Sequence, residues 1–255
     1  MNEARDDLTD DAFLGGRLRL LQPRKGHRAG HDAMLLAAAA DVQGGERVVE
    51  FGAGVGAAAL ALARRTGAID LTLVEMDERL ATLARENVAR NGLTARVLVL
   101  DVEAKADAFV AAGLAPDSVD HVLMNPPFND ADRHQPSPDV QRRSAHHAAA
   151  FTIETWSRAA LRILKPGGRL TLIWRADGLA AILAALSRGF GSVAVLPVHP
   201  KPEMAAIRVL VVATKGSRAP LTILPELLLA DAAGAATPQA QAISRGEAVV
   251  QLSKR

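Results

Sequence analysis

From residue 46 onward, short apolar runs alternate with segments in which apolar residues recur every three or four positions. Glycine, asparagine and acidic residues bound the short runs, which is typical of buried strands, and the spacing in the other segments is typical of helices. Regular alternation of the two predicts an α/β fold with a doubly wound, mainly parallel sheet. The predicted strands are 47–51, 69–75, 95–100, 118–125 and 169–174, and the predicted helices are 56–65, 78–91, 103–112, 151–164 and 177–188.

The alternation of strand and helix patterns is interrupted at both ends of the chain. Residues 193–198 and 207–214 are apolar runs joined by a loop without a helix, which predicts an antiparallel pair. We therefore expect a Rossmann-like sheet of seven strands with an antiparallel C-terminal hairpin. Residues 14–21 indicate a small hairpin arm, and residues 32–40 indicate an alanine- and leucine-rich helix. Asp177 is a candidate N-cap for the last predicted helix.

Composition limits the classes of protein open to this chain. With 49% hydrophobic and 23% charged residues it is an ordinary globular sequence, and no apolar run approaches the length of a membrane span. The absence of cysteine excludes disulfides and thiolate metal sites and fits a reducing compartment. Residues 1–11 are unlike a signal peptide, so we expect a cytoplasmic protein. We expect residues 1–45 to pack as an arm and helix on a core formed by residues 46–255, in one compact domain of unknown oligomeric state.

Charge is unevenly distributed along the chain. Residues 1–127 carry 14 Lys and Arg against 19 Asp and Glu, a net charge of −5, whereas residues 128–255 carry 16 against 9, a net charge of +7. A basic half favours a polyanionic partner such as RNA, although an uneven scatter of solvated arginines is the alternative. Aromatic residues make up only 3% of the chain, so charge must supply most of any RNA affinity.

Three glycines follow the first predicted strand. Glycine lets the backbone turn tightly and approach a ligand closely, and ligands of doubly wound folds bind at the carboxyl ends of the strands. Glu50, Gly52, Gly54 and Gly56 are therefore candidate residues of a nucleotide-like cofactor site. A tight turn without a ligand and a nicotinamide dinucleotide site both stay open here. The dinucleotide site usually carries Gly-x-Gly-x-x-Gly, whereas position 57 of this chain is Ala57.

Two later strands also end in carboxylates. Glu75, followed by Met76, ends the second predicted strand, where a carboxylate can accept hydrogen bonds from both ribose hydroxyls. Asp101, followed by Val102, ends the third predicted strand, where the adenine edge of a nucleoside cofactor is expected. Each carboxylate could instead be a solvated strand end, but three ligand-compatible strand ends in succession favour a cofactor site.

The fourth predicted strand runs into the turn Asn125-Pro126-Pro127-Phe128. An exocyclic amine of a nucleobase is a weak nucleophile because its lone pair is delocalised into the ring. The side-chain oxygen of Asn125 and the carbonyl of Pro126 can accept its two hydrogens and direct the lone pair outward, and proline adds no competing N–H. Phe128 can stack on the base. The turn predicts methyl transfer from S-adenosylmethionine to an exocyclic nitrogen, unless it simply ends a strand.

These motifs together resemble the class I S-adenosylmethionine-dependent methyltransferases of the amino-methylating Asn-Pro-Pro-aromatic group. The resemblance covers residues 46–215 and includes the Lys-Pro-Gly-Gly turn at 165–168. Residues 22–36 and 208–216 are most similar to the tRNA(Val) adenine N6-methyltransferases. That resemblance implies S-adenosyl-L-methionine as cofactor, with Asn125 among its contacts, and adenine N6 beside the anticodon of a tRNA as the acceptor.

Three other functions are weighed against this one. The guanine-N2 rRNA methyltransferases share the turn but often continue with histidine, where this chain has Asn129. The protein-glutamine methyltransferases that act on release factors usually carry tyrosine in place of Phe128. A non-catalytic nucleotide- or RNA-binding module is disfavoured by the intact turn and glycine motif.

Basic residues gather in the arm and after the Asn-Pro-Pro-Phe turn. They are candidate phosphate contacts, although they could equally be solvated. We expect no metal, because His134, His146 and His147 lack acidic or cysteine partners at ligand spacing. The candidate RNA-binding residues are Arg24, Lys25, Arg28, Arg133, Arg142 and Arg143.

Overall fold

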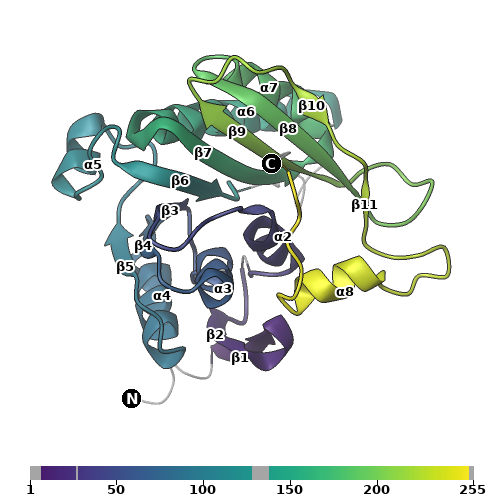
Figure 1. Cartoon of the computed structure of the whole chain (residues 1–255), viewed down its shortest axis with the longest axis horizontal. Coiled ribbons are helices and arrows are strands. Elements are labelled where there is room, and N and C mark those ends of the chain that lie inside the picture. The colour runs from purple at the N-terminus through teal and green to yellow at the C-terminus, as the bar shows by residue number, and fades with distance from the viewer. Residues whose placement is uncertain (1–6, 27, 128–137, 253–255) are drawn as a thin grey trace.

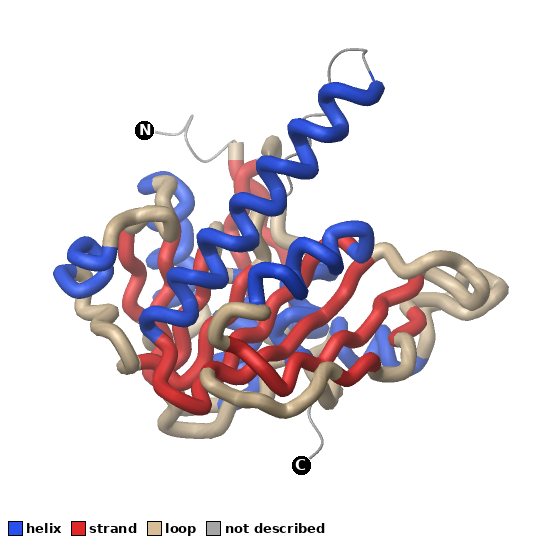
Figure 2. The backbone as a smooth tube through the Cα atoms, turned by 90° about the horizontal axis from the view of Figure 1, so that it is seen from above, coloured by secondary structure: helices blue, strands red, loops and turns tan. Residues whose placement is uncertain are grey.

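A mixed nine-stranded sheet forms the centre of the molecule, and helices cover both of its faces (Figures 1 and 2). The computed structural model describes residues 7–26, 28–127 and 138–252, with side chains from residue 150 onward in the last range. The strands of this sheet are β3 (Arg47–Phe51), β4 (Asp70–Glu75), β5 (Arg96–Val99), β6 (Val119–Met124), β7 (Leu164–Arg175), β8 (Phe190–His199), β9 (Arg208–Lys215), β10 (Thr222–Ile223) and β11 (Leu227–Leu228). Their order is β10-β8-β9-β7-β6-β3-β4-β5, and β11 pairs with β8.

Strands β5, β4, β3, β6 and β7 run parallel, and β9 and β8 continue the sheet as an antiparallel pair. This arrangement confirms the predicted doubly wound fold with its antiparallel C-terminal hairpin. The two short strands β10 and β11, which pair in parallel with β8, were not predicted. Each has two residues, which is too short to show an alternating pattern.

Alternation within the strands builds one apolar core on each face of the sheet. In β3, Val48 belongs to one core, whereas Val49 and Phe51 belong to the other. The first face is covered by α2 (His31–Ala39), α3 (Ala57–Thr66) and α4 (Glu78–Arg90), and the second by α5 (Ala106–Ala111), α6 (Pro138–Ile163) and α7 (Leu179–Leu186). Figure 2 shows α6, the longest of these helices, lying across the second face.

Two helix starts differ from the prediction. Helix α6 begins at Pro138 and not at residue 151, because proline is well accommodated in the first turn of a helix and does not have to mark a loop. The predicted cap Asp177 lies in a short 3₁₀ turn, Ala176–Gly178, and its carboxylate pairs with Arg175. Helix α7 therefore begins after Gly178, without a side-chain cap.

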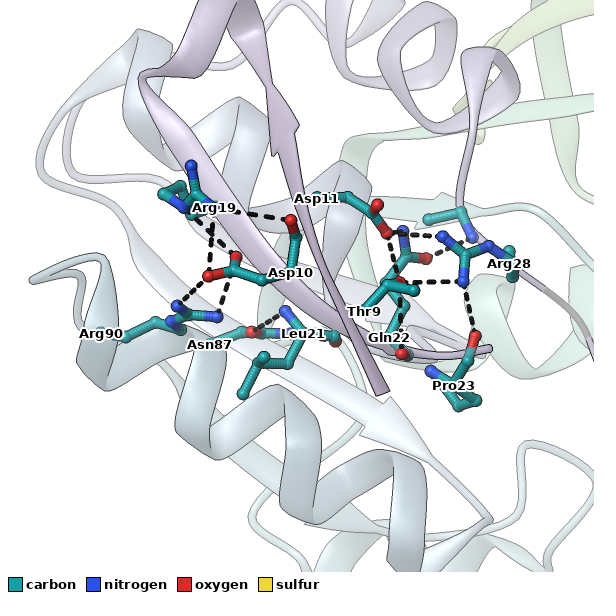
Figure 3. Close-up of polar contacts among 11 residues, drawn as sticks. Thr9, Asp10, Asp11, Arg19, Leu21, Gln22, Pro23, Arg28, Asn87 and Arg90 are labelled. Atoms are coloured by element: carbon teal, nitrogen blue, oxygen red, sulfur yellow. Dashed lines mark hydrogen bonds and ion pairs between the residues drawn. The ribbon is translucent and has the colours of Figure 1, made fainter. Parts of the chain in front are cut away.

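The N-terminal arm is a hairpin of β1 (Leu8–Phe13) and β2 (Leu18–Pro23), longer than the predicted segment 14–21. The acidic residues of β1 gave it no apolar pattern, so the strand was not predicted from the sequence. One of these residues fixes the strand in place, because Asp10 pairs with Arg90 of α4 at 2.8 Å and with Arg19 at 3.1 Å (Figure 3). Asn87 of α4 is fully buried and bonds both the backbone N–H and the carbonyl of Leu21. The arm is thus fixed to the helix that follows β4.

The C-terminal region returns to the first helix. Helix α8 (Pro238–Ser244) is capped by the hydroxyl of Thr237 and lies beside α2 (Figure 1). Ile243 and Val250 are buried in the core that α2 shares, and the backbone N–H of Val250 donates to the carbonyl of Ala38. Among the helices of the described ranges, none is both long and apolar enough to cross a membrane. The domain boundary predicted at residue 45 stays a prediction.

Candidate active site

The glycine turn after β3 is built from three left-handed backbone positions, at Gly52, Gly54 and Gly56. A Cβ atom on Gly52 would lie 2.4 Å from the ring of Trp156, and one on Gly56 would lie 2.8 Å from Leu73. Packing therefore allows only glycine at these two positions without rearrangement. Nothing lies within 4 Å of a Cβ built on Gly54, so the middle of the turn faces open space. That open backbone is where a ligand can approach.

Glu75, at the end of β4, holds the turn in place. Its Oε2 accepts a hydrogen bond from the Gly54 N–H at 2.7 Å, and its Oε1 accepts one from the Asp77 N–H at 2.9 Å. Each oxygen keeps a second lone pair, which can accept a ribose hydroxyl. The side chain is 7% exposed. Glu75 therefore links the glycine turn to the adjacent strand end.

Glu50, the next-to-last residue of β3, is buried beneath the same turn. Its Oε2 accepts a hydrogen bond from the Ala59 N–H at 2.9 Å at the start of α3. Burial, together with a smaller effect of the nearby charge of Glu75, raises the pKa of Glu50 to about 8, against the lowering effect of the hydrogen bond from Ala59. Glu50 is therefore protonated at neutral pH, and its carboxylic acid can donate a hydrogen bond into the pocket that it lines.

Asn125 directly follows β6 and lines that pocket together with Glu50 and the turn at residues 52–55. Its Oδ1 atom is buried and has no hydrogen-bond partner within the ranges that the structure describes. A buried acceptor without a partner is costly, so such an atom is typical of a site that a ligand completes. Pro126 is buried and Pro127 is exposed, and Phe128 lies outside the described residues.

The other predicted cofactor residues lie at neighbouring strand ends but do not line this pocket. Asp101 is exposed and its Oδ1 accepts a hydrogen bond from the Glu103 N–H at 2.8 Å. Val102 is buried, whereas the side chain of Met76 is 68% exposed. An exposed thioether next to Glu75 offers an apolar surface to a ring such as adenine.

The predicted RNA-binding residues have different environments. Arg28 pairs with Asp11 at 2.6 Å and also donates to the hydroxyl of Thr9 and the carbonyl of Pro23, so it ties the arm together (Figure 3). Arg24 and Lys25 are exposed at the end of the hairpin. Arg133 and the side chains of Arg142 and Arg143 lie outside the described residues.

Two other residues of this pocket were not among the predicted site residues. Ala29 and Leu80 line the pocket with Asn125, although neither side chain carries a reactive group. Ala29 is held there by Gln22, a residue 1% exposed whose Oε1 accepts a hydrogen bond from the Ala29 N–H at 2.8 Å. In the described part of the chain, no three His, Asp or Glu side chains gather into a group that could hold a metal ion.

The sheet order and the glycine turn at the end of β3 define a class I methyltransferase fold. The chain belongs to the methyltransferase small domain family, whose model matches residues 29–201. This membership confirms the resemblance to methyltransferases inferred from the motifs.

Several named proteins are similar to this chain. The tRNA1(Val) (adenine(37)-N6)-methyltransferase of Bacteroides thetaiotaomicron is 34% identical over 63% of this chain, and the match spans 65% of that relative, just under two thirds. The protein of the same name from Erwinia tasmaniensis is 31% identical over 72% of this chain and 73% of its own length. A crystal structure from Agrobacterium tumefaciens, described as a predicted O-methyltransferase, is 34% identical with a TM-score of 0.72, over 86% of this chain and 98% of that one.

Proposed function

We propose that the protein transfers the methyl group of S-adenosylmethionine to the N6 amine of an adenine beside the anticodon of a tRNA. The buried, unpartnered Oδ1 of Asn125, in the same pocket as the glycine turn, carries this proposal. The names of the relatives from Bacteroides thetaiotaomicron and Erwinia tasmaniensis support adenine N6 of tRNA as the acceptor. A tRNA substrate also implies a cytoplasmic location.

The cofactor fits the residues that the structure brings together. The open backbone at Gly54 would approach its amino-acid part, and Glu75 would accept its ribose hydroxyls. Met76 and Val102 would flank the adenine, with Asp101 at its edge. When bound, S-adenosylmethionine supplies a methyl group that is electrophilic because it is attached to a positively charged sulfur.

Asn125 then acts on the acceptor. Its Oδ1 and the Pro126 carbonyl would accept the two amine hydrogens, which favours a pyramidal nitrogen with its lone pair toward the methyl group. The bound cofactor would supply the methyl group for a new N–C bond in place of its S–C bond, and the amine would lose one proton to solvent. The protein contributes alignment and electrostatics and needs no base before the transfer.

Acceptor oxygen is disfavoured, even though one similar structure is described as a predicted O-methyltransferase. A hydroxyl acceptor must lose its proton to become a strong nucleophile, which requires a nearby base. The carboxyl group that lines the pocket in the described residues, Glu50, has a pKa raised to about 8 by burial and is therefore protonated at neutral pH.

Mass spectrometry of nucleosides tests the proposal. Purified protein is incubated with S-adenosylmethionine and tRNA that lacks the modification, and N6-methyladenosine should accumulate with wild-type protein but not with Asn125→Ala. Labelled guanine N2 would replace the proposed acceptor with the rRNA-type activity, and labelled release factor would replace it with the protein-glutamine activity. If the protein binds the nucleotide cofactor but transfers no methyl group to any of these substrates, it would be a non-catalytic nucleotide- or RNA-binding module.

A further inference from the structure

A hollow of about 400 Å³ opens between the start of α2, the start of β9 and helix α8. Its lining is mostly apolar and includes Met34, Ile207 and Leu229. The ion pair between Arg208 and Asp32, at 2.9 Å, lies in the same lining. The residues that form it come from both ends of the chain, and the methyl-transfer chemistry proposed above uses none of them.

A second hollow lies between this one and the candidate active site and shares lining residues with both. This second hollow lies along the arm, has a volume of about 430 Å³ and shares His31 and Met34 with the first. The arm hollow in turn shares Ala29 with the pocket of Asn125. The three cavities are therefore neighbours through shared lining residues, from the pocket of Asn125 past the first turn of α2 to helix α8.

The sheet places the hollow at the catalytic edge. Arg208 begins β9 and pairs in register with Arg175, the last residue of β7. Strand β7 lies beside β6, which ends next to Asn125. Met124, the last residue of β6, is in register with Leu172 and through it with Val211, and Arg208 lies three residues further along β9. With strands about 4.8 Å apart and about 3.3 Å per residue, the start of β9 lies roughly 14 Å from the end of β6. A chain of nucleotides that delivers one base to Asn125 can reach this point with an adjacent nucleotide.

The chemistry of the lining selects among possible occupants. An apolar pocket of a few hundred Å³ with a few convergent polar groups suits a flat, aromatic ligand with hydrogen-bonding edges. A purely apolar ligand would bury the Arg208–Asp32 pair without replacing its contacts with water, which is costly. A nucleobase can cover the apolar side chains with its faces and bond the carboxylate or the guanidinium with its edge.

We propose that this hollow, here called the flanking-base pocket, binds the base of a nucleotide adjacent to the methylated adenosine in the RNA substrate. The proposal rests on the proposed function, since it assumes an RNA acceptor at Asn125. It assigns Met34 and Leu229 to the faces of the flanking base and Asp32 with Arg208 to its edge. Recognition of a second base gives the enzyme sequence selectivity that the acceptor site alone does not provide.

An abasic scan of an anticodon stem-loop tests the pocket. The probe is the full-length protein with synthetic RNAs, each lacking one base within three nucleotides of the target. Removal of one flanking base should weaken binding about tenfold, whereas removal of the others should change it less than about threefold. Uniform affinity across all flanking positions overturns the proposal.

A substitution that fills the flanking-base pocket, paired with a control substitution on the same helix, provides a second test. Ala240 lines the pocket on α8, whereas Ala242, also half-buried on α8, does not. Ala240→Phe should weaken binding of the intact stem-loop about tenfold, yet leave unchanged the binding of the RNA that already lacks the flanking base. Ala242→Phe should bind both RNAs as wild type does, and thermal unfolding checks that both variants fold.

The outcomes separate the two proposals. If wild-type protein methylates adenine N6 but Ala240→Phe binds every RNA like Ala242→Phe, the flanking-base pocket is wrong and the proposed function stands. If wild-type protein methylates no nucleic acid, the proposed function fails, and the pocket proposal fails with it.

Discussion

The amino ends of the parallel strands and the glycine turn at the carboxyl end of β3 carry opposite arrangements of polar groups. Near the amino ends of the strands, Lys165 pairs with Asp120 at 2.6 Å and Arg169 pairs with Asp41 at 3.3 Å. At the carboxyl ends, Glu50 and Glu75 have no cationic partner in the described ranges, and their oxygens accept bonds from backbone N–H groups only.

The difference indicates which end is shaped by stability and which by a ligand. At the amino ends, each of these charged side chains has a partner of opposite charge within the protein and needs no ligand. At the carboxyl ends, a protonated carboxylic acid, a carboxylate with spare lone pairs and the open acceptor of Asn125 meet around one turn. Natural proteins accept such unfavourable local arrangements mainly at functional sites.

The largest expected effect concerns Glu50 and pH. Its pKa is raised from 4.5 to about 8 in the folded protein by burial, so between these values the folded state holds a proton that the unfolded state has lost. The contribution of Glu50 to the free energy of unfolding should therefore fall as pH rises from about 4.5 to 8, by at most about 5 kcal/mol. Chemical denaturation across this range should show this fall in the difference between wild type and Glu50→Gln. Parallel curves for the two proteins would contradict it.

Buried His121 gives the opposite slope. Burial lowers its pKa to about 3, with a smaller lowering effect from Arg169, and its Nε2 lies 2.7 Å from the hydroxyl of Thr171. In the unfolded state His121 is protonated below about pH 6.5, whereas in the folded state it stays neutral down to about pH 3. The free energy of unfolding therefore decreases as pH falls below about 6.5. Subtracting the wild-type curve from that of Glu50→Gln removes this common contribution, provided that both proteins keep His121.

The second effect concerns turnover. Asn125→Ala removes an acceptor that acts on the amine as it becomes nucleophilic, so the maximal rate should fall about 10²–10³-fold. The dissociation constant of S-adenosylmethionine should change less than about threefold. Single-turnover methylation and calorimetry measure the two quantities separately. A variant that keeps more than about a third of the rate would exclude the proposed role.

Much of this site was predictable because its signals are local. The glycine turn, Glu75 and Asn125 each directly follow, or end, a buried strand, and the parallel order of β4, β3 and β6 brings those ends to one edge. Strand β3 has the predicted bounds, 47–51, because an apolar run meets a glycine turn there. The local pattern and the fold topology were together sufficient to predict that these residues lie at one edge of the sheet.

The remaining features depend on contacts between distant segments. Gln22 reaches Ala29 across the end of the arm, and Asn87 joins the arm to the Val55 carbonyl in the glycine turn at 3.1 Å. Gln22 begins the segment 22–36 that carries the resemblance, but nothing in that segment indicates its contact with Ala29, and Asn87 belongs to no motif. Strand β11 is defined only by its pairing with β8. The spacing of apolar residues along the sequence does not predict contacts between such distant segments.

The third effect compares the two ends of the sheet directly. Glu75→Ala removes the carboxylate proposed to accept the ribose hydroxyls, a charge-assisted interaction worth about 1.5–3 kcal/mol, so S-adenosylmethionine should bind about 10–100-fold more weakly. The variant also loses the two hydrogen bonds that the carboxylate accepts from Gly54 and Asp77. Asp120→Asn weakens the pair with Lys165 at the other end. It should lower the free energy of unfolding by about 1 kcal/mol and leave cofactor affinity unchanged. Equal losses of cofactor affinity in both variants would refute the division between the ends.

The smallest effect concerns RNA and salt. Arg142 and Arg143 follow the Asn-Pro-Pro-Phe turn in the basic half of the chain, and each phosphate contact contributes about 0.7–0.9 to the slope of log affinity against log salt concentration. The double variant Arg142→Ala with Arg143→Ala should therefore flatten that slope by up to about two units and leave cofactor binding intact. Lys165→Ala, which removes a paired cation at the opposite end, is the matched control and should leave the slope unchanged. If both variants flatten the slope equally, net charge and not a phosphate contact by Arg142 or Arg143 governs RNA affinity.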